Sequence, residues 1–127
     1  MIAVDNDAGH CAFARTWTQC FGTAVEVVQS DSVGWLRQHN EPIDVLYLDS
    51  LDTESEGAAA HGLAEIQAAY PHLHAASLVA FDDTVFRAGQ YHGKGALGVP
   101  WLLDQGWELI YSGHQTVVAT RAFLRNS

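Results

Sequence analysis

Short apolar runs alternate along this chain with segments in which apolar residues recur every three or four positions. The runs predict strands at residues 2–4, 24–28, 43–48 and 78–81. Helical spacing predicts helices between these strands, marked by the following apolar residues: Phe13, Trp17, Cys20 and Phe21; Val33 and Leu36; Ala59, Leu63, Ile66 and Tyr70; and Val99, Leu102 and Leu103. Two more runs, 107–111 and 115–121, are separated by too few residues for a crossover helix, so they predict an antiparallel pair.

This order predicts an α/β fold formed by a single domain over residues 1–127. We expect a three-layer, mostly parallel, Rossmann-like sheet with helices on both faces and a C-terminal antiparallel strand pair. Five of the six residues from Ile43 to Leu48 are apolar. Such a run is typical of a strand buried on both faces, so it predicts the centre of the fold.

Composition narrows the function classes. The formal net charge is −9, with only six lysine and arginine residues, which argues against nucleic acid and anionic membrane surfaces as partners. No apolar run approaches the length of a membrane-spanning helix, and no signal peptide is evident, so we expect a cytoplasmic protein. The two cysteines, Cys11 and Cys20, are predicted to be free and mostly buried thiols.

Carboxylates follow four of the predicted strands: Asp5 and Asp7, Asp31, Asp49, and Asp82 with Asp83. Each one alone is compatible with a turn or helix-capping role. If the strands are parallel, however, all of these acids lie along one edge of the sheet. Clustered carboxylates attract a cation, and their hard oxygens suit Mg²⁺.

These acids predict two kinds of site. Asp49, Asp82 and Asp83 are candidate ligands of a divalent metal ion. An acid directly after a strand can also accept hydrogen bonds from ribose hydroxyls, as Asp5 is placed to do, and Asp31 could reach an adenine amino group. The acids Asp52 and Glu54 are interpreted as solvated loop charges.

Val4-Asp5, Gln29-Ser30-Asp31, residues 43–49 and 78–83 and the closing strand pair together resemble class I S-adenosylmethionine-dependent methyltransferases. The spacing of Asp49 and Asp82-Asp83 resembles the metal-dependent catechol O-methyltransferase type. The resemblance covers nearly the whole chain. It implies transfer of a methyl group from S-adenosylmethionine to an oxygen of a small molecule.

The resemblance also implies roles for individual residues. Asp5 would hold the ribose, Ser30 and Asp31 the adenine, and Asp49 would lie at both the cofactor and the metal. Asp49, Asp82 and Asp83 would bind a divalent ion such as Mg²⁺, which orients the substrate oxygen and lowers its pKa.

The sequence departs from this family at its start. The family's first strand and the glycine-rich turn that holds the methionine end of the cofactor have no counterpart here, and residues 89–98 carry glycines too late in the chain. We therefore expect weak or absent cofactor binding and little turnover. The strand at Ile2 should pair directly with the strand at Ile43 or be completed by another molecule. Apolar surface left uncovered predicts a homodimer.

Other interpretations stay open. A response-regulator receiver, phosphorylated at Asp49, has a similar size and an acid after its third strand. Its fourth strand should end in serine or threonine, however, and here Asp82-Asp83 come first.

Lys94, between two glycines, is a candidate base or anion contact, or else a surface lysine. Histidines are weaker candidates, either as general bases near the sheet edge or as loop metal ligands: His10, His72, His74 and His114.

Overall fold

The computed structural model of this protein describes residues 1–51 and 55–121. Asp52 and Glu54, predicted to be solvated loop charges, lie outside the described residues. The chain divides into two compact units, Met1–His39 and Asn40–Ser127.

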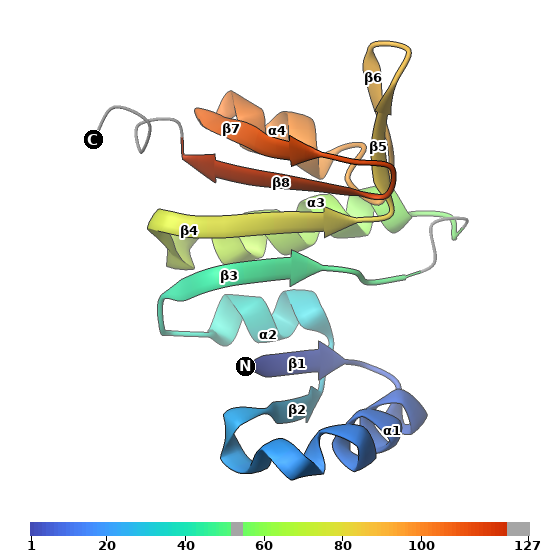
Figure 1. The fold of residues 1–127 in the computed structure, drawn as a ribbon, viewed down its shortest axis with the longest axis vertical. Helices are drawn as coiled ribbons and strands as arrows, with labels where there is room; N and C mark the ends of the chain where they lie inside the picture. The colour runs from blue at the N-terminus through green and yellow to red at the C-terminus, as the bar shows by residue number, and fades with distance from the viewer. Residues whose placement is uncertain (52–54, 122–127) are drawn as a thin grey trace. The chain divides into compact units, whose positions relative to one another are not determined.

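The first unit is a β-α-β-α segment. Its elements are β1 (Ile2–Asp5), α1 (Ala8–Thr18), the 3-10 helix η1 (Gln19–Ala24), β2 (Glu26–Gln29) and α2 (Ser32–Gln38). β1 and β2 pair in parallel, with Asp5 opposite Gln29, and α1 contacts both strands (Figure 1). Asp7 caps α1, because its carboxylate accepts a hydrogen bond from the backbone N–H of His10.

The apolar stripe of the first helical segment is exposed. Phe13, Trp17 and Phe21 are 67%, 69% and 61% exposed. Cys11 is fully buried, but Cys20 is exposed, so the prediction that both thiols are buried is wrong for Cys20. The prediction failed because the segment bends out of the α-helix at η1, where Gly22 has φ 58°. Both cysteines are free, as predicted.

The second unit contains the larger sheet. Its elements are β3 (Ile43–Leu48), α3 (Ala58–Ala69), the 3-10 helix η2 (Tyr70–His72), β4 (Leu73–Asp82), β5 (Thr84–Arg87), β6 (Gln90–Gly93), α4 (Gly98–Asp104), β7 (Trp107–Ser112) and β8 (Thr116–Arg121). The strand order is β3-β4-β8-β7 (Figure 1). β3 and β4 are parallel, and β8 is antiparallel to both β4 and β7. The predicted α/β fold with a C-terminal antiparallel pair is thus confirmed.

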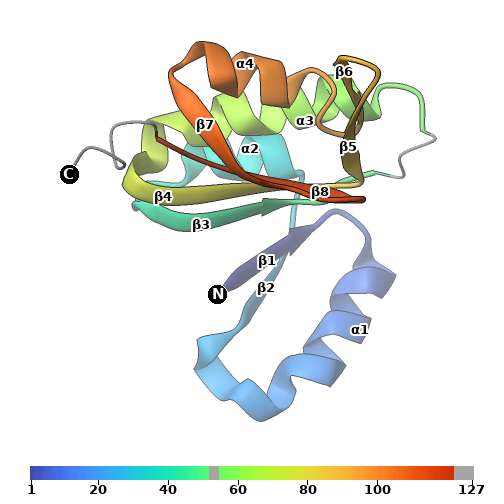
Figure 2. The same ribbon diagram turned by 45° about the horizontal axis from the view of Figure 1, so that its top comes forward.

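Helices α3 and α4 lie on the same face of this sheet (Figure 2). Between them and the sheet lies the core, which comprises Leu48, Ile66, Leu73, Val79, Phe81, Val99, Leu102, Trp107, Val117 and Ala119. Gly98 lets α4 approach closely, because a Cβ there would lie 2.9 Å from the Phe81 ring. The core therefore fixes the end of β4, where Asp82 is the last residue of the strand and Asp83 follows it.

The prediction that residues 43–48 are buried on both faces is wrong. β3 is an edge strand of its sheet, and Val45 and Tyr47 are 66% and 58% exposed. The more buried strand is β4, which begins at Leu73 rather than Leu78. The polar residues near its start did not match the apolar pattern of a buried strand. Ser77 is nevertheless buried, because its hydroxyl donates a hydrogen bond to the Ile43 carbonyl at 2.6 Å.

The glycine-rich segment contains a hairpin that the sequence did not predict. β5 and β6 pair antiparallel and are joined at Ala88 and Gly89, both with positive φ. In Figure 1 this hairpin follows the end of β4.

The two units bear differently on the expected strand pairing. β1 and β3 belong to different units, so a direct pairing of the strands at Ile2 and Ile43 stays a prediction. The strand next to β4 on its other side is the antiparallel β8, whereas a receiver needs a parallel fifth strand. The receiver alternative is therefore wrong. In the part of the chain that the structure describes, no helix is long and apolar enough to cross a membrane.

Candidate functional site

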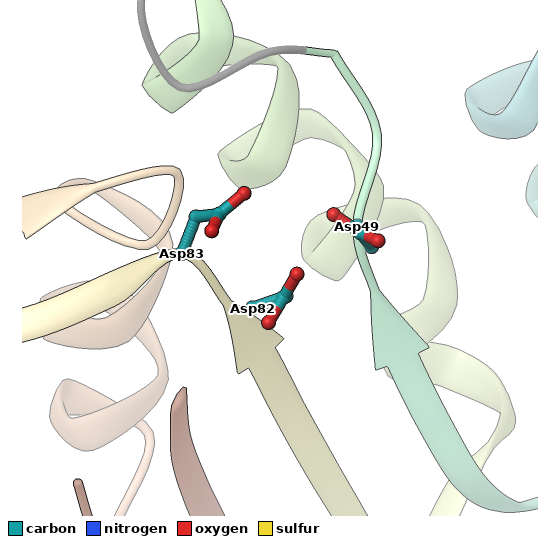
Figure 3. A group of neighbouring side chains, drawn as sticks. All are labelled: Asp49, Asp82 and Asp83. Carbon is teal, nitrogen blue, oxygen red and sulfur yellow. The ribbon is translucent and has the colours of Figure 1, made fainter. Parts of the chain in front are cut away.

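Three carboxylates meet at the ends of β3 and β4. Because Leu48 pairs with Phe81 in a parallel ladder, the residues that follow each strand emerge side by side. One ligand oxygen from each of Asp49, Asp82 and Asp83 lies within 4.8 Å of the others, and the three side chains face a common space (Figure 3). Asp83 has φ 45°, a left-handed conformation that aspartate tolerates better than most residues. We call these three residues the acid cluster.

A lysine from a distant part of the chain pairs with two of these carboxylates. The ammonium of Lys94 donates to Asp49 Oδ1 at 2.6 Å and lies 3.0 Å from Asp83 Oδ2. Its side chain is 9% exposed, whereas those of Asp49 and Asp83 are 46% and 36% exposed. The lysine thus approaches from inside the protein, while the carboxylates keep part of their surface in solvent. The interpretation of Lys94 as a surface lysine is wrong.

The electrostatics follow from these contacts. Burial alone lowers the pKa of the Lys94 amine, but the hydrogen bonds to Asp49 and Asp83 outweigh it and leave the pKa above its usual value. Burial raises the pKa of Asp49 and the neighbouring Asp82 adds to this rise, whereas Lys94 opposes it. Lys94 is therefore charged at neutral pH and stabilises the ionised form of Asp49.

A second buried acid supports the turn after Asp49. Glu65 on α3 is only 3% exposed, and its Oε2 accepts a hydrogen bond from the Ser50 hydroxyl at 2.7 Å. His61, one helical turn earlier, places Nε2 3.7 Å from Glu65 Oε1. Sequence reasoning missed this group, because a glutamate inside an apolar helical stripe does not by itself indicate its partner.

The first unit has its own acid edge at the ends of β1 and β2. Asp5 Oδ1 accepts a hydrogen bond from the Asp7 N–H at 2.8 Å, and Oδ2 lies 3.3 Å from His10 Nδ1. Ser30 follows β2, and its N–H donates to the Asp5 carbonyl. Asp31 caps α2 through a 2.7 Å hydrogen bond from Gly34 N–H. The structure thus places Asp5, Ser30 and Asp31 together. A common edge that joins these residues with the acid cluster stays a prediction.

The predicted histidines take other places. His10 belongs to the Asp5 edge, where it is exposed. His74 Nε2 lies 2.7 Å from the exposed Asp44, near the start of β4 rather than its end. His114 is exposed in the turn between β7 and β8. Among the described residues, three or more potential metal ligands come together only in the acid cluster. His72 is not one of them.

The acid cluster does not fit the predicted divalent ion as it is folded. Its three carboxylates are suitable hard donors. However, Asp49 Oδ1 and Asp83 Oδ2, two of the oxygens that such an ion would need, already accept from the Lys94 ammonium. An ion could take both oxygens only if this buried lysine moved away.

In the first unit, Asp5 fits the ribose-binding role that the sequence predicts for it. The Asp5 carboxylate is 44% exposed at the carboxyl end of a parallel strand, and the Asp7 N–H fixes its orientation. Both features suit a carboxylate that accepts from a ribose diol. None of the turns after β1, β2 or β3 carries a glycine-rich sequence for the methionine end.

Comparison with solved structures shows the fold. A protein from Streptococcus mutans, assigned as a methyltransferase and solved in complex with SAH, matches 94% of this chain and 74% of its own, with a TM-score of 0.62 and 15% identity. An assigned O-methyltransferase from Klebsiella pneumoniae matches 95% of this chain and 61% of its own, with a TM-score of 0.63 and 15% identity.

The glycopeptide N-methyltransferase MtfA, solved in complex with sinefungin, matches 94% of this chain and 70% of its own, with a TM-score of 0.59 and 12% identity. No protein-family profile matches the sequence, and no curated protein sequence matches it. The chain therefore has the fold of the class I S-adenosylmethionine-dependent methyltransferases.

Proposed function

We propose that this protein is an S-adenosylmethionine-dependent methyltransferase that acts on a hydroxyl group of a small molecule. The observation that carries the proposal is a class I methyltransferase fold over 94% of the chain in which acids end the parallel strands. Ligands of open α/β sheets bind at such strand ends. Neighbours solved with SAH or sinefungin support a cofactor of the same type.

On the cofactor side, Asp5 accepts hydrogen bonds from the ribose hydroxyls, and Ser30 and Asp31 contact the adenine. The pairing of β1 with β2 supports these roles, because it places Asp5 opposite Gln29, directly before Ser30. When bound, S-adenosylmethionine supplies a methyl group that is activated by its bond to a sulfonium.

On the acceptor side, the half-exposed oxygens of Asp49 and Asp83 accept a hydrogen bond from the substrate hydroxyl. These carboxylates would hold and orient the acceptor hydroxyl and would take up its proton, directly or through water, while bound S-adenosylmethionine would supply the methyl group. Three carboxylates against one ammonium leave the acid cluster negative, which favours a hydrogen-bond donor and disfavours an anionic acceptor such as a phosphate ester. The predicted divalent ion is not part of this proposal, because Lys94 already supplies a cation.

Titration calorimetry with S-adenosylhomocysteine tests the cofactor side. We expect weak binding by the wild type, with a dissociation constant of about 0.1 mM or above. Asp5→Asn should weaken it by at least about tenfold, because hydrogen bonds to a charged group contribute about 1.5–3 kcal/mol. Asp104→Asn, an exposed acid of the second unit, is the control with the same charge change. Equal binding by all three proteins, or none by the wild type at millimolar ligand, would contradict the proposal.

We also propose that two copies of the chain associate through the edge strand β3. The exposed Val45 and Tyr47 on this strand support the proposal, because an apolar strand edge favours pairing with another chain. Sedimentation equilibrium should then give a dimer mass for the wild type and a monomer mass for Val45→Lys. A monomeric wild type at about 100 µM would refute this part, since stable dimers persist well below that concentration.

A further inference from the structure

Lys94 is the only lysine in the sequence, and the fold buries it. Lysine is among the residues least often buried, and it is buried mainly when it is paired. Here its ammonium contacts two carboxylates that follow two different strands, one of them 45 positions away in sequence. Such a placement requires a dedicated local structure, which the glycine-rich segment provides.

The backbone around Lys94 is fixed from three sides. Its N–H donates to the Asp83 carbonyl at 3.1 Å, and the next N–H, of Gly95, donates to the buried Thr84 hydroxyl at 2.9 Å. Gly93 has φ 91°, and a Cβ there would collide with the Asp83 carbonyl. On the other side, a Cβ on Gly62 of α3 would lie 2.6 Å from the Lys94 carbonyl. The glycines thus allow β6, α3 and the end of β4 to enclose this residue.

A lysine held in this way competes with a metal ion for the same oxygens. A divalent ion binds carboxylate oxygens at about 2.0–2.6 Å, and the Lys94 nitrogen already lies 2.6 Å from Asp49 Oδ1. Displacing the ammonium would leave a buried positive charge without its partners and beside a dication. Both effects oppose metal binding.

We infer that Lys94 is the resident cation of the acid cluster and takes the place that the sequence predicts for a divalent metal ion. The cluster of Asp49, Asp82 and Asp83 is then a metal-independent site, whose geometry is set by a lysine that the chain itself supplies. This inference goes beyond the proposed methyl transfer and does not depend on it, because its tests need neither cofactor nor substrate.

The first test uses the wild-type protein and the fact that it contains a single lysine. Protein labelled with ¹³C,¹⁵N-lysine gives one lysine side-chain signal in an NMR spectrum, and that signal reports on Lys94 alone. We expect its Cε and Nζ shifts to stay unchanged on addition of MgCl₂ to about 10 mM at constant ionic strength, a range that covers weak protein sites for such ions. A saturable change toward the shifts of a free lysine would overturn the inference.

The second test removes the cation. Lys94→Met keeps an unbranched apolar side chain of similar length but leaves the carboxylates without their ammonium. Electron paramagnetic resonance with Mn²⁺ should detect one ion per chain, bound at least about tenfold more tightly than by the wild type. Adding Asp83→Asn to this variant should remove the gained binding.

Two controls separate the local effect from a change in net charge. Arg87→Met removes one positive charge from the exposed end of β5, and Lys94→Arg keeps a cation at the cluster. Neither should gain Mn²⁺ binding. The inference fails if the wild type binds one Mn²⁺ as tightly as Lys94→Met, or if Arg87→Met gains as much as Lys94→Met does.

Discussion

The two units of this protein hold the acids at their strand ends in different ways. In the first unit, Asp5 and Asp31 accept from backbone N–H groups two or three residues further along the chain, and both stay near the surface. In the second unit, Asp49 and Asp83 share a buried lysine, which for Asp49 comes from 45 positions away. One edge is therefore set by local turn and capping geometry, and the other by tertiary packing.

This difference also separates the roles that the two edges can play. A carboxylate held by its own turn keeps its position even when nearby elements move, which suits the recognition of a ligand. A carboxylate held by a buried lysine depends on the integrity of the whole core around it. Disturbing the acid cluster should therefore be costly for the fold, whereas disturbing the first edge should affect mainly binding.

Among changes at the two acid edges, the largest effect should come from removing the partners of the lysine. In the double variant Asp49→Asn, Asp83→Asn, the Lys94 ammonium stays buried and loses both of the carboxylates that it contacts. We expect the free energy of unfolding to fall by about 3 kcal/mol, because removing the partners of a buried charge leaves it uncompensated. Urea unfolding followed by tryptophan fluorescence measures this change. A loss below about 0.5 kcal/mol, as expected for the exposed control Asp104→Asn, would mean that the contacts of Lys94 contribute no stability.

Gly62→Ala should have the next largest effect. Alanine has the higher helix propensity, by about 1 kcal/mol, so propensity alone predicts stabilisation. Its Cβ would lie 2.6 Å from the Lys94 carbonyl, however, and must push α3 away from that backbone. Overpacking of this kind costs about 1–3 kcal/mol, so we expect a net loss in the same urea experiment. A net gain in stability would show that the backbone around Lys94 yields easily.

Local patterns in the sequence predict the first edge well and the second only in part. Ser30, Asp31 and Ser32 precede the apolar positions Val33 and Leu36, and each could cap a helix there. In the structure the cap is Asp31. Parallel strands with acids after them predicted that Asp49 and Asp82 would be neighbours. Neither pattern could identify Lys94, because its pairing depends on the β5–β6 hairpin, which returns the chain to Asp83 at the end of β4.

Burial was harder to predict than secondary structure. Hydrophobic spacing correctly predicted a helical segment around Phe13 and Trp17 and a strand at Ile43–Leu48, but both expose apolar side chains. An apolar pattern specifies that a residue can be buried. Whether it is buried depends on which element covers it, and that information lies in other parts of the chain.

A smaller effect is expected where the contact is local. Asp31→Ala removes the carboxylate that accepts from Gly34 N–H and should destabilise α2 by about 1 kcal/mol. Asp31→Asn is the matched variant, because asparagine caps helices about as well, and it should cost little. The measurement is hydrogen exchange of the α2 backbone amides. If both variants exchange at the same faster rate, the charge of Asp31 rather than its capping bond stabilises the helix.

The smallest effect should come from the exposed aromatic stripe. Trp17 is 69% exposed, and its ring centroid lies 5.9 Å from that of Phe13. Because its contacts are mainly with one exposed ring, Trp17→Ser should change the free energy of unfolding by no more than about 0.5 kcal/mol. Trp107→Ala is the contrasting variant: Trp107 is 3% exposed in the core, and its loss should cost about 3–5 kcal/mol. A loss of 2 kcal/mol or more for the Trp17 variant in urea unfolding, growing with protein concentration, would contradict this expectation. It would show that a second molecule covers the stripe, since only stabilisation by association depends on concentration. The contrast between the units would then be one between an intermolecular and an intramolecular core, rather than between an exposed and a buried one.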